Sequence, residues 1–299
     1  MSSPLIDRPL WGVFLYVTQV ACFFIISLLV KTLAEDFAVT ELLLVRFSAT
    51  LLVLLVIIGM RRNFAFLKTR YAGDHAVRTV CGMTALGLTF VALSNAYIAN
   101  ATAVVLSAPI IATVLAIFVL KETVLLSRMA AVIVGFFGIL LIVKPGWGSS
   151  NPAIYAALGA AVLFAFVIVW LRKLNRSEHP LCISFYYNVS GFSVFLAWTI
   201  VAGFSDAWTQ APGLLGLILL LGVLGAAQQI LLSYSFRYAD ASLLAPFEYL
   251  SLPLVLIAGF AIWEELPDVL SLTGAGIIVA CGILLVVKEI RNPAKKVIA

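Results

Sequence analysis

Charge is scarce in this chain of 299 residues: Asp, Glu, Lys and Arg together make up 11% of it. Hydrophobic residues make up 63%, and the mean hydropathy is +1.13. A soluble domain carries about 25% charged residues and cannot bury so much apolar surface. The composition therefore excludes a soluble globular protein. It predicts an all-α integral membrane protein, because the apolar runs do not alternate as the strands of a membrane barrel do.

Cysteine and histidine are too few and too scattered for the sites they usually form. The four cysteines fall singly in separate apolar stretches without a CxxC spacing: Cys22, Cys81, Cys182 and Cys281. We therefore expect neither a disulfide framework nor a metal site. His75 and His179 fall in predicted connections on one side, so no Ser–His pair or HExxH motif is expected within the membrane. The chain also lacks a Walker A motif. We expect no cofactor, no enzymatic activity and no ATP-driven pump.

Apolar stretches long enough to span a bilayer are, by contrast, abundant. A bilayer core of about 30 Å needs about 20 helical residues per crossing. Ten stretches of about this length are predicted as transmembrane helices: 10–30, 41–60, 77–94, 97–119, 127–143, 152–171, 181–202, 213–234, 240–262 and 268–287. The first is too long for the apolar region of a signal peptide and lacks a clear small-residue cleavage site, so we expect it to be retained.

The cations are divided unevenly between the two sides of these helices. Counting the N-terminus and every second connection as one side places 16 of the 19 Lys and Arg residues there. The opposite side holds Lys31 and Lys144, and Arg46 falls inside the second helix. The positive-inside rule then predicts cytoplasmic termini, in a bacterial inner or plasma membrane. This topology accounts for the net charge of +5, so we do not expect nucleic-acid binding.

An acidic cluster and two repeated segments complete the pattern of the connections. Glu264, Glu265 and Asp268 fall on the outer side and are expected to form a solvated loop. The segment GILLIVK at 138–144 recurs as GILLVVK at 282–288. Farther upstream, ANAT from Ala99 is matched by ADAS from Ala239, in the same order. These matches indicate an internal duplication.

The duplication divides the chain into two units, 11–144 and 153–288, followed by a cytoplasmic tail at 289–299. Each unit has five predicted helices, an odd number, so the second enters the membrane inverted relative to the first. Inverted repeats are a common plan of secondary transporters, which place their site near the midplane between the halves. The repeat therefore favours a carrier.

Several short motifs strengthen this interpretation by their order along the chain: Arg46 in RFSATLLVLL, Arg78, Pro109, KET at 121–123, LAPFEY at 244–249 and EELP at 264–267. Through them the chain resembles the drug/metabolite transporter superfamily in its ten-helix EamA form. The resemblance implies a central cavity lined mainly by the first, third, fourth, sixth, eighth and ninth helices. It also implies cargo among amino acids, other metabolites, nucleotide-like molecules and drugs, often moved outward.

Polar residues deep in the predicted helices mark a candidate binding site, because polar groups are costly there. Glu248 falls about 12 Å from the cytoplasmic start of the ninth helix, and Gln19 and the pair Gln228–Gln229 fall at a similar depth. The predicted substrate-binding residues are Tyr16, Gln19, Ser107, Gln228, Gln229, Glu248 and Tyr249. Each Gln has a structural alternative, a hydrogen bond between helices. Adjacent residues point about 100° apart on a helix, so only one of the pair is expected to face a cavity.

Glu248 has three interpretations: it binds a cationic group of the cargo, it titrates as a proton carrier, or it is held by a partner beside Pro246. Proline frees backbone carbonyls and bends a helix, so Pro109, Pro246 and Pro253 are predicted hinges. Pro109 and Pro253 are 144 residues apart, as are the last residues of the two GILL segments. Arg46 lies near the outer end of its helix, where we expect it to reach the interface or bond a carbonyl.

Together these features predict a secondary transporter that exports a small amphipathic metabolite by alternating access, with an aromatic amino acid as the leading cargo. A passive facilitator, a multidrug or cationic-metabolite carrier, and a structural partner of another membrane complex are the alternatives. The expected partners are the lipid bilayer and the small-molecule substrate, with proton coupling depending on Glu248. The sequence predicts no oligomeric state.

Overall fold

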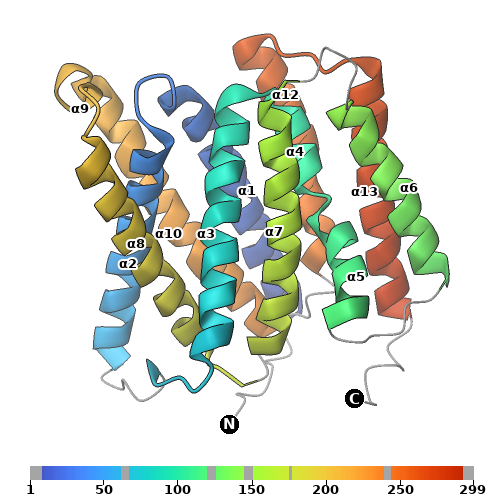
Figure 1. Ribbon diagram of the computed structural model, residues 1–299, viewed down its shortest axis with the longest axis horizontal. Coiled ribbons are helices and arrows are strands. Elements are labelled where there is room, and N and C mark those ends of the chain that lie inside the picture. The colour runs from blue at the N-terminus through green and yellow to red at the C-terminus, as the bar shows by residue number, and fades with distance from the viewer. Residues whose placement is uncertain are drawn as a thin grey trace.

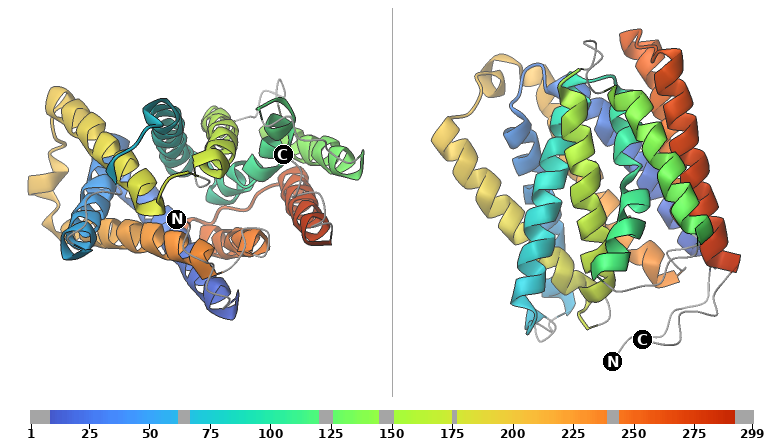
Figure 2. Two further views of the ribbon diagram at one scale, coloured as in Figure 1. Left: turned by 90° about the horizontal axis from the view of Figure 1, so that it is seen from below. Right: turned by 45° about the vertical axis from the view of Figure 1, so that its right-hand side comes forward.

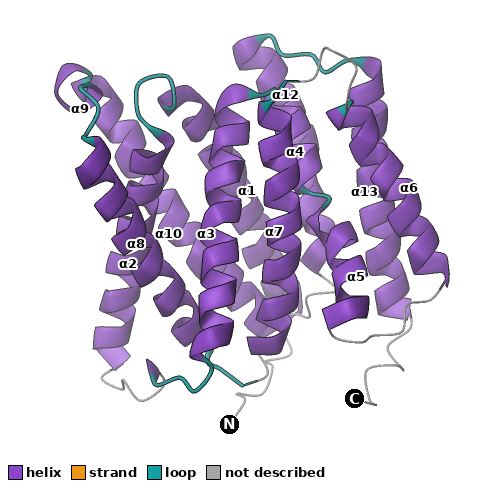
Figure 3. Ribbon diagram, in the orientation of Figure 1, coloured by secondary structure: helices purple, strands orange, loops and turns teal. Residues whose placement is uncertain are grey.

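The computed structural model describes residues 9–61, 67–119, 126–144, 151–174, 177–238 and 244–291, and within these ranges every regular element is a helix (Figure 3). The all-α prediction is confirmed. Six helices of these ranges are long and apolar enough to cross a membrane alone. They are α1 (Pro9–Leu33), α2 (Val39–Arg61), α3 (Ala72–Asn95), α7 (Ala153–Leu174), α8 (Pro180–Ala202) and α10 (Leu215–Tyr238).

Shorter apolar stretches lie in the remaining long elements: α4 (Ile98–Val105), α5 (Ala108–Val119), α6 (Leu126–Val143), α12 (Ser251–Trp263) and α13 (Val269–Arg291). Two short turns, α9 (Ala207–Gln210) and η2 (Pro212–Leu214), lead into α10. Each predicted stretch coincides with one or two of these elements, so the count of ten crossings depends on the shorter ones. The predicted tail at 289–299 starts as the last turn of α13; residues 292–299 lie outside the described ranges.

The fourth and ninth predicted helices are each interrupted near a proline that was predicted as a hinge. The fourth ends as α4 at Val105 and resumes as α5 at Ala108. The ninth contains a 3₁₀ segment, η3 (Ala245–Leu250), before α12 begins at Ser251; residues 239–243 lie outside the described ranges. Each break is followed closely by a proline, Pro109 or Pro253, which lacks an amide hydrogen and clashes with the carbonyl four residues earlier.

The helices form an elongated array (Figures 1 and 2). At one end α6 packs against α13, and at the other α2 packs against α8. Between these ends α3 packs along α7, and α1 packs along α10 (Figure 1). The first helix of each half thus packs against the third spanning element of the other half. A twofold relation between the predicted repeats would lead to such a pattern.

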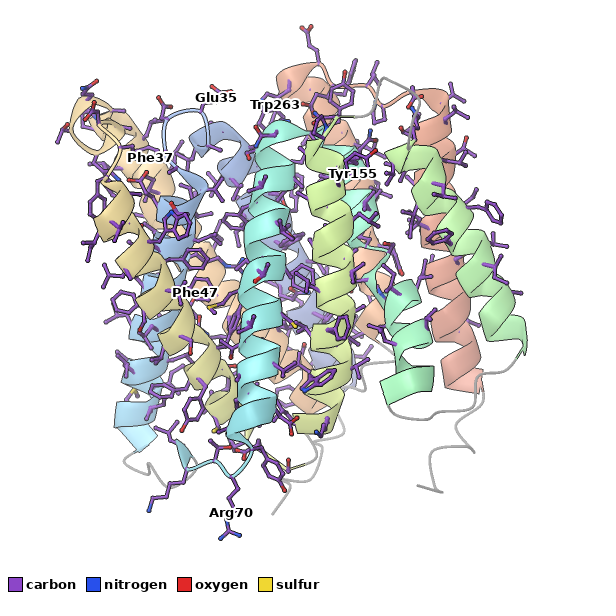
Figure 4. All side chains as sticks on the ribbon, viewed as in Figure 1. Glu35, Phe37, Phe47, Arg70, Tyr155 and Trp263 are labelled. Carbon is purple, nitrogen blue, oxygen red and sulfur yellow. The ribbon has the colours of Figure 1, made fainter. Side chains whose placement is uncertain are left out.

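The pair α6–α13 approaches most closely at two glycines. A Cβ on Gly274 would lie 2.5 Å from the carbonyl oxygen of Gly138, so only glycine allows the two backbones to come together here. The first turn of α1 and the last turn of α13 lie at the same end of the array (Figure 1). Arg70 lies at this end, and Glu35 and Trp263 lie at the opposite one (Figure 4). We call these the Arg70 end and the Glu35 end.

Candidate functional site

Glu248 lies in η3, just before the break that leads into α12. The hydroxyl of Tyr16, in α1, hydrogen-bonds its carboxyl group. Tyr16 is 4% exposed and packs in a small apolar cluster with Val20 and Leu244. Of the three predicted interpretations of Glu248, the structure therefore supplies a partner, while its contact with cargo and its titration stay predictions.

Tyr249, the next residue, is buried, and its hydroxyl has no hydrogen-bond partner within the described part of the chain. The ring occupies the space beside Gly282 of α13, where a Cβ would overlap it. Gln19 is also buried and lies three residues after Tyr16, so the two share a face of α1. Two elements, α1 and η3, thus bring Tyr16, Gln19 and Glu248 to one side of the bundle.

Gln228 and Gln229 diverge as predicted, toward different helices. Gln228 Oε1 accepts a hydrogen bond of 2.6 Å from Arg46 Nη2 of α2. Gln229 Nε2 donates to Ser184 Oγ of α8 at 3.3 Å. Both bonds join helices, which is the structural alternative for these residues, and both Gln side chains remain partly exposed.

Ser107 is fully buried and donates from Oγ to the carbonyl oxygen of Val104 at 2.6 Å, so its hydroxyl belongs to the break between α4 and α5. Pro109 is the second residue of α5, and Pro253 is the third residue of α12. The first turn of a helix needs no amide donor, so proline fits both places. Pro246 lies in η3, and its side chain is outside the described set.

Arg46 points into the bundle rather than to the outer interface, and of the two expected outcomes the bond to a carbonyl is observed, with the side-chain carbonyl oxygen of Gln228 as the acceptor. Its guanidinium carbon lies 5.9 Å from the ring centroid of Phe90 in α3, and its Nη2 bonds Gln228. Its Nη1 is buried without a hydrogen-bond partner among the described residues. The distance of a residue from a helix end does not reveal toward which neighbour its side chain points, and this is why sequence reasoning left both outcomes open.

Arg78 was counted with the cytoplasmic loop cations, but α3 begins at Ala72, so Arg78 lies in its second turn and is only 7% exposed. Its guanidinium carbon lies 3.7 Å from the ring centroid of Tyr187 in α8. Nε and Nη1 have no hydrogen-bond partner in the described chain. Gly82, one turn later, leaves room for this stack, because a Cβ there would lie 3.0 Å from the Tyr187 ring.

His75 also lies in α3 rather than in a connection, and it is 4% exposed. Its possible ligand atoms, with those of Glu178 and Cys182, all lie within 4.8 Å of one another, so these three residues could hold a metal ion. Glu178 Oε1 accepts a hydrogen bond from Thr69 Oγ1 at 2.8 Å. The prediction of no metal site rested partly on the wrong place of His75, and it stays a prediction.

The acidic cluster lies in a loop where Glu264 and Asp268 are exposed, as expected, but Glu265 is largely buried, contrary to expectation. Glu265 Oε1 lies 2.6 Å from Lys31 Nζ, and both side chains are largely buried. Glu265 Oε2 also accepts from the backbone amide of Ile98 at 3.0 Å, where it caps the start of α4. Lys31 Nζ donates further to the carbonyl of Ala96 at 2.8 Å. This ion pair joins α1, the start of α4 and the end of α12 at the Glu35 end.

A second ion pair at the same end joins Lys144 with Asp268. The hydrogen bond from Lys144 holds the pKa of Asp268 below its ordinary value. Asp268 also accepts from the backbone amide of Ser271 at 3.2 Å, in the first turn of α13. Glu264 is exposed, as the prediction expected of the whole cluster.

Comparison with known proteins decides the family. The model of the EamA-like transporter family matches this chain twice, at residues 10–144 and 151–288. The chain belongs to the EamA-like transporter family. It is therefore a multi-pass membrane transporter of a small metabolite and not an enzyme.

The names of several relatives of this EamA-like transporter state what each of them transports. An S-adenosylmethionine uptake transporter of Rickettsia bellii (strain RML369-C) is 30% identical over 69% of each chain. A riboflavin transporter of Vibrio cholerae serotype O1 is 27% identical over 91% of each chain. A protein of known crystal structure has the same fold, with a TM-score of 0.63 at 16% identity over 96% of this chain and 98% of its own.

Proposed function

We propose that this chain is a secondary transporter that moves a small amphipathic metabolite by alternating access between its two halves. The observation that carries the proposal is the pair of breaks, one before Pro109 and one before Pro253, 144 residues apart. Transporters of this plan bind cargo where helices are discontinuous in corresponding positions of the two halves. Only irregular backbone that is buried in protein or lines a cavity is tolerated at this depth.

The arrangement of the helices supports the same proposal. The units 11–144 and 153–288 nearly coincide with the two family matches, and α1–α10 packing mirrors α7–α3 packing. The outermost turns of α1 and α13 lie at the Arg70 end. We place this end in the cytoplasm of a bacterial cell, because the cation count assigns its connections there. The two halves are then inverted copies.

The cargo that we propose combines a flat ring with a polar or charged group. Tyr16 and Tyr249 offer aromatic faces, and Glu248 offers a carboxyl group. Aromatic amino acids meet this description, as do S-adenosylmethionine and riboflavin, after which the relatives are named. Export follows from the family resemblance, whereas the name of the Rickettsia relative favours uptake.

Reconstituted proteoliposomes test both the activity and its direction. Radiolabelled L-tryptophan, S-adenosylmethionine and riboflavin are offered on either side, with and without an imposed proton gradient. We expect saturable, concentrative flux of at least one of them, which a protonophore abolishes. Flux that never exceeds its own gradient would indicate a facilitator. Counterflow of none of the three would contradict the proposed cargo class.

A further inference from the structure

We propose that Arg46 and Arg78, two incompletely bonded arginines of α2 and α3, bind the carboxylate of the transported metabolite, an inference that rests on the proposed function. They and Tyr187 come from α2, α3 and α8, and neither the family match nor the relatives assign them a role. Tyr187 relates the two arginines to each other. Arg78 stacks on its ring at 3.7 Å, and the same ring contacts Phe47, which follows Arg46 in α2.

The cluster lies deep in the bundle. Phe47, beside Arg46 in α2, packs edge to face against Tyr187, with 5.2 Å between the two ring centroids. Figure 4 shows Phe47 about midway between the Glu35 end and the Arg70 end. Arg78 and Tyr187 are 7% and 8% exposed. Secondary transporters of inverted-repeat plan bind their cargo at this depth.

Buried hydrogen-bond donors without acceptors point to a missing ligand. Nε and Nη1 of Arg78 and Nη1 of Arg46 are buried and have no partner among the residues that the structure describes. An unsatisfied buried donor costs about 1–3 kcal/mol, and more when it is charged. Such groups are therefore retained where a ligand completes them. The Arg78 guanidinium carbon lies 3.7 Å from the centroid of the Tyr187 ring, and that of Arg46 lies 5.9 Å from the centroid of Phe90. An aromatic ring supplies no hydrogen-bond acceptor for their unpaired donors comparable to an oxyanion.

The charge of the cluster is also uncompensated. None of the ion pairs within the described ranges involves Arg46 or Arg78. The nearby carboxylates bond other groups: Asp74, one turn before Arg78, accepts from Trp170 and Lys173, and Glu178 accepts from Thr69. Glu41 accepts four hydrogen bonds, from Ala38, from Ser205 twice and from Trp208. Glu248 bonds Tyr16. Two arginines in a low dielectric therefore attract an anionic group, because desolvated charges persist only when they are paired.

Glycines on two helices give the arginines their space. A Cβ on Gly225 of α10 would lie 2.7 Å from Cγ of Arg46, and a Cβ on Gly82 would lie 3.3 Å from Nη1 of Arg78. Guanidinium groups recognise planar oxyanions through two parallel hydrogen bonds, and a carboxylate fits this geometry. A purely structural arginine would saturate its donors on protein groups, whereas Arg46 bonds Gln228 through Nη2 and leaves Nη1 without a partner among the described residues.

Matched probe pairs test the inference directly. Binding to the purified protein is measured by calorimetry for L-tryptophan against tryptamine and for S-adenosylmethionine against its decarboxylated form. We expect the carboxylate of at least one pair to raise the affinity about tenfold or more, the scale of a charge-assisted bidentate contact. Arg78→Gln and Arg46→Gln should abolish this preference, and the Lys variants should retain part of it. Arg70→Gln removes an exposed charge and should change nothing.

Equal affinity for both members of every pair, or binding of none, would overturn the carboxylate site. So would Arg→Gln variants that weaken both members equally, since that is the effect of a structural role. If the Gln variants do not fold, the wild-type preference and the Lys variants decide. A preference confined to flavin mononucleotide over riboflavin would show a phosphate site instead and reject the inference. A carboxylate preference without flux in proteoliposomes would reject the proposed function and leave the site standing.

Discussion

α-Helical geometry is interrupted in both halves, by a two-residue turn between α4 and α5 in the first and by the 3₁₀ segment η3 before α12 in the second, and a serine bonds the backbone at each break. In the first half Ser107 Oγ donates to the carbonyl of Val104 at 2.6 Å. In the second half Ser251 Oγ donates to the carbonyl of Glu248 at 2.8 Å. Both bonds reach back three residues, and in each half a proline follows the serine by two residues.

Different side chains near the two breaks separate the shared framework from the cargo chemistry. Val104 and Val105 end α4 just before the first break, whereas Glu248 and Tyr249, 144 residues later, lie in the 3₁₀ segment η3. The duplication therefore retains the discontinuous backbone in both halves but places a carboxyl group in only one of them. We infer that the breaks serve the movement common to both halves, and that recognition depends on residues that the repeat does not share.

The largest effect is expected from the carboxyl group that distinguishes the two breaks. Glu248→Gln keeps a hydrogen-bonding group for Tyr16 but removes the charge and the titration. We expect the rate of transport in proteoliposomes to fall about tenfold or more, a loss of about 1.4 kcal/mol of stabilisation, and its pH dependence to vanish. Val104→Thr changes the polarity at the matching position and should keep the rate within about twofold. Unchanged transport by Glu248→Gln would show that the carboxyl group is structural.

The second largest effect is expected on protein stability, and it concerns Tyr249, which stands where the first half has Val105. A Cβ at Gly282 would overlap the Tyr249 ring, so Gly282→Ala should destabilise the protein by about 1–3 kcal/mol through overpacking. Adding Tyr249→Val, which restores the residue type found at 105, should recover most of this loss. Gly276→Ala meets nothing within 4 Å and is the matched control in the same helix. Thermal unfolding in detergent measures all three, and a Gly282→Ala variant as stable as the control would contradict the packing.

The framework was largely predictable from the sequence, since it follows from local properties. The length of the apolar runs located the helices, and the cation count predicted on which side of the membrane each connection lies. The breaks were only half found: Pro109 and Pro253 were recognised as paired, but a proline inside an apolar run predicts a kink as well as an interruption. The serine bonds that accompany the breaks depend on a local geometry that the residue pattern alone does not specify.

The candidate site also contains residues that the sequence alone could identify and residues that it could not. Glu248 was identifiable because a carboxyl group is costly at that depth wherever it points. His75 was placed in a connection because α3 starts five residues earlier than its apolar run, and Arg78 was recognised as a motif residue but counted among the loop cations. The partner of Lys31, Glu265, lies in the other half, and the Arg78–Tyr187 stack joins α3 to α8. Such contacts depend on how helices are rotated against each other, which one helix's sequence does not determine.

The prolines test whether the shared framework moves. Pro109→Ala and Pro253→Ala restore a backbone donor at each break without removing a side chain from the polar cluster. If the breaks are hinges, each variant should lower the transport rate several-fold, on the order of 1 kcal/mol, while substrate affinity stays within about twofold. Similar losses in both variants would agree with a common movement. A loss of affinity with an unchanged rate would assign the prolines to the shape of the site instead.

The smallest effect is expected from substitution of Ser107 and Ser251. It tests most directly whether the two helix breaks are structurally equivalent. Ser107→Ala and Ser251→Ala each remove one buried hydrogen bond to a carbonyl three residues earlier, worth about 0.5–1.5 kcal/mol. If the two breaks are structurally equivalent, the melting temperatures should fall equally, by roughly 1–5 °C. Because Ser251 bonds the backbone of Glu248, its loss should also shift the pH profile of transport, whereas loss of Ser107 should not. Identical pH profiles would mean that the carboxyl group is positioned by Tyr16 rather than by the break.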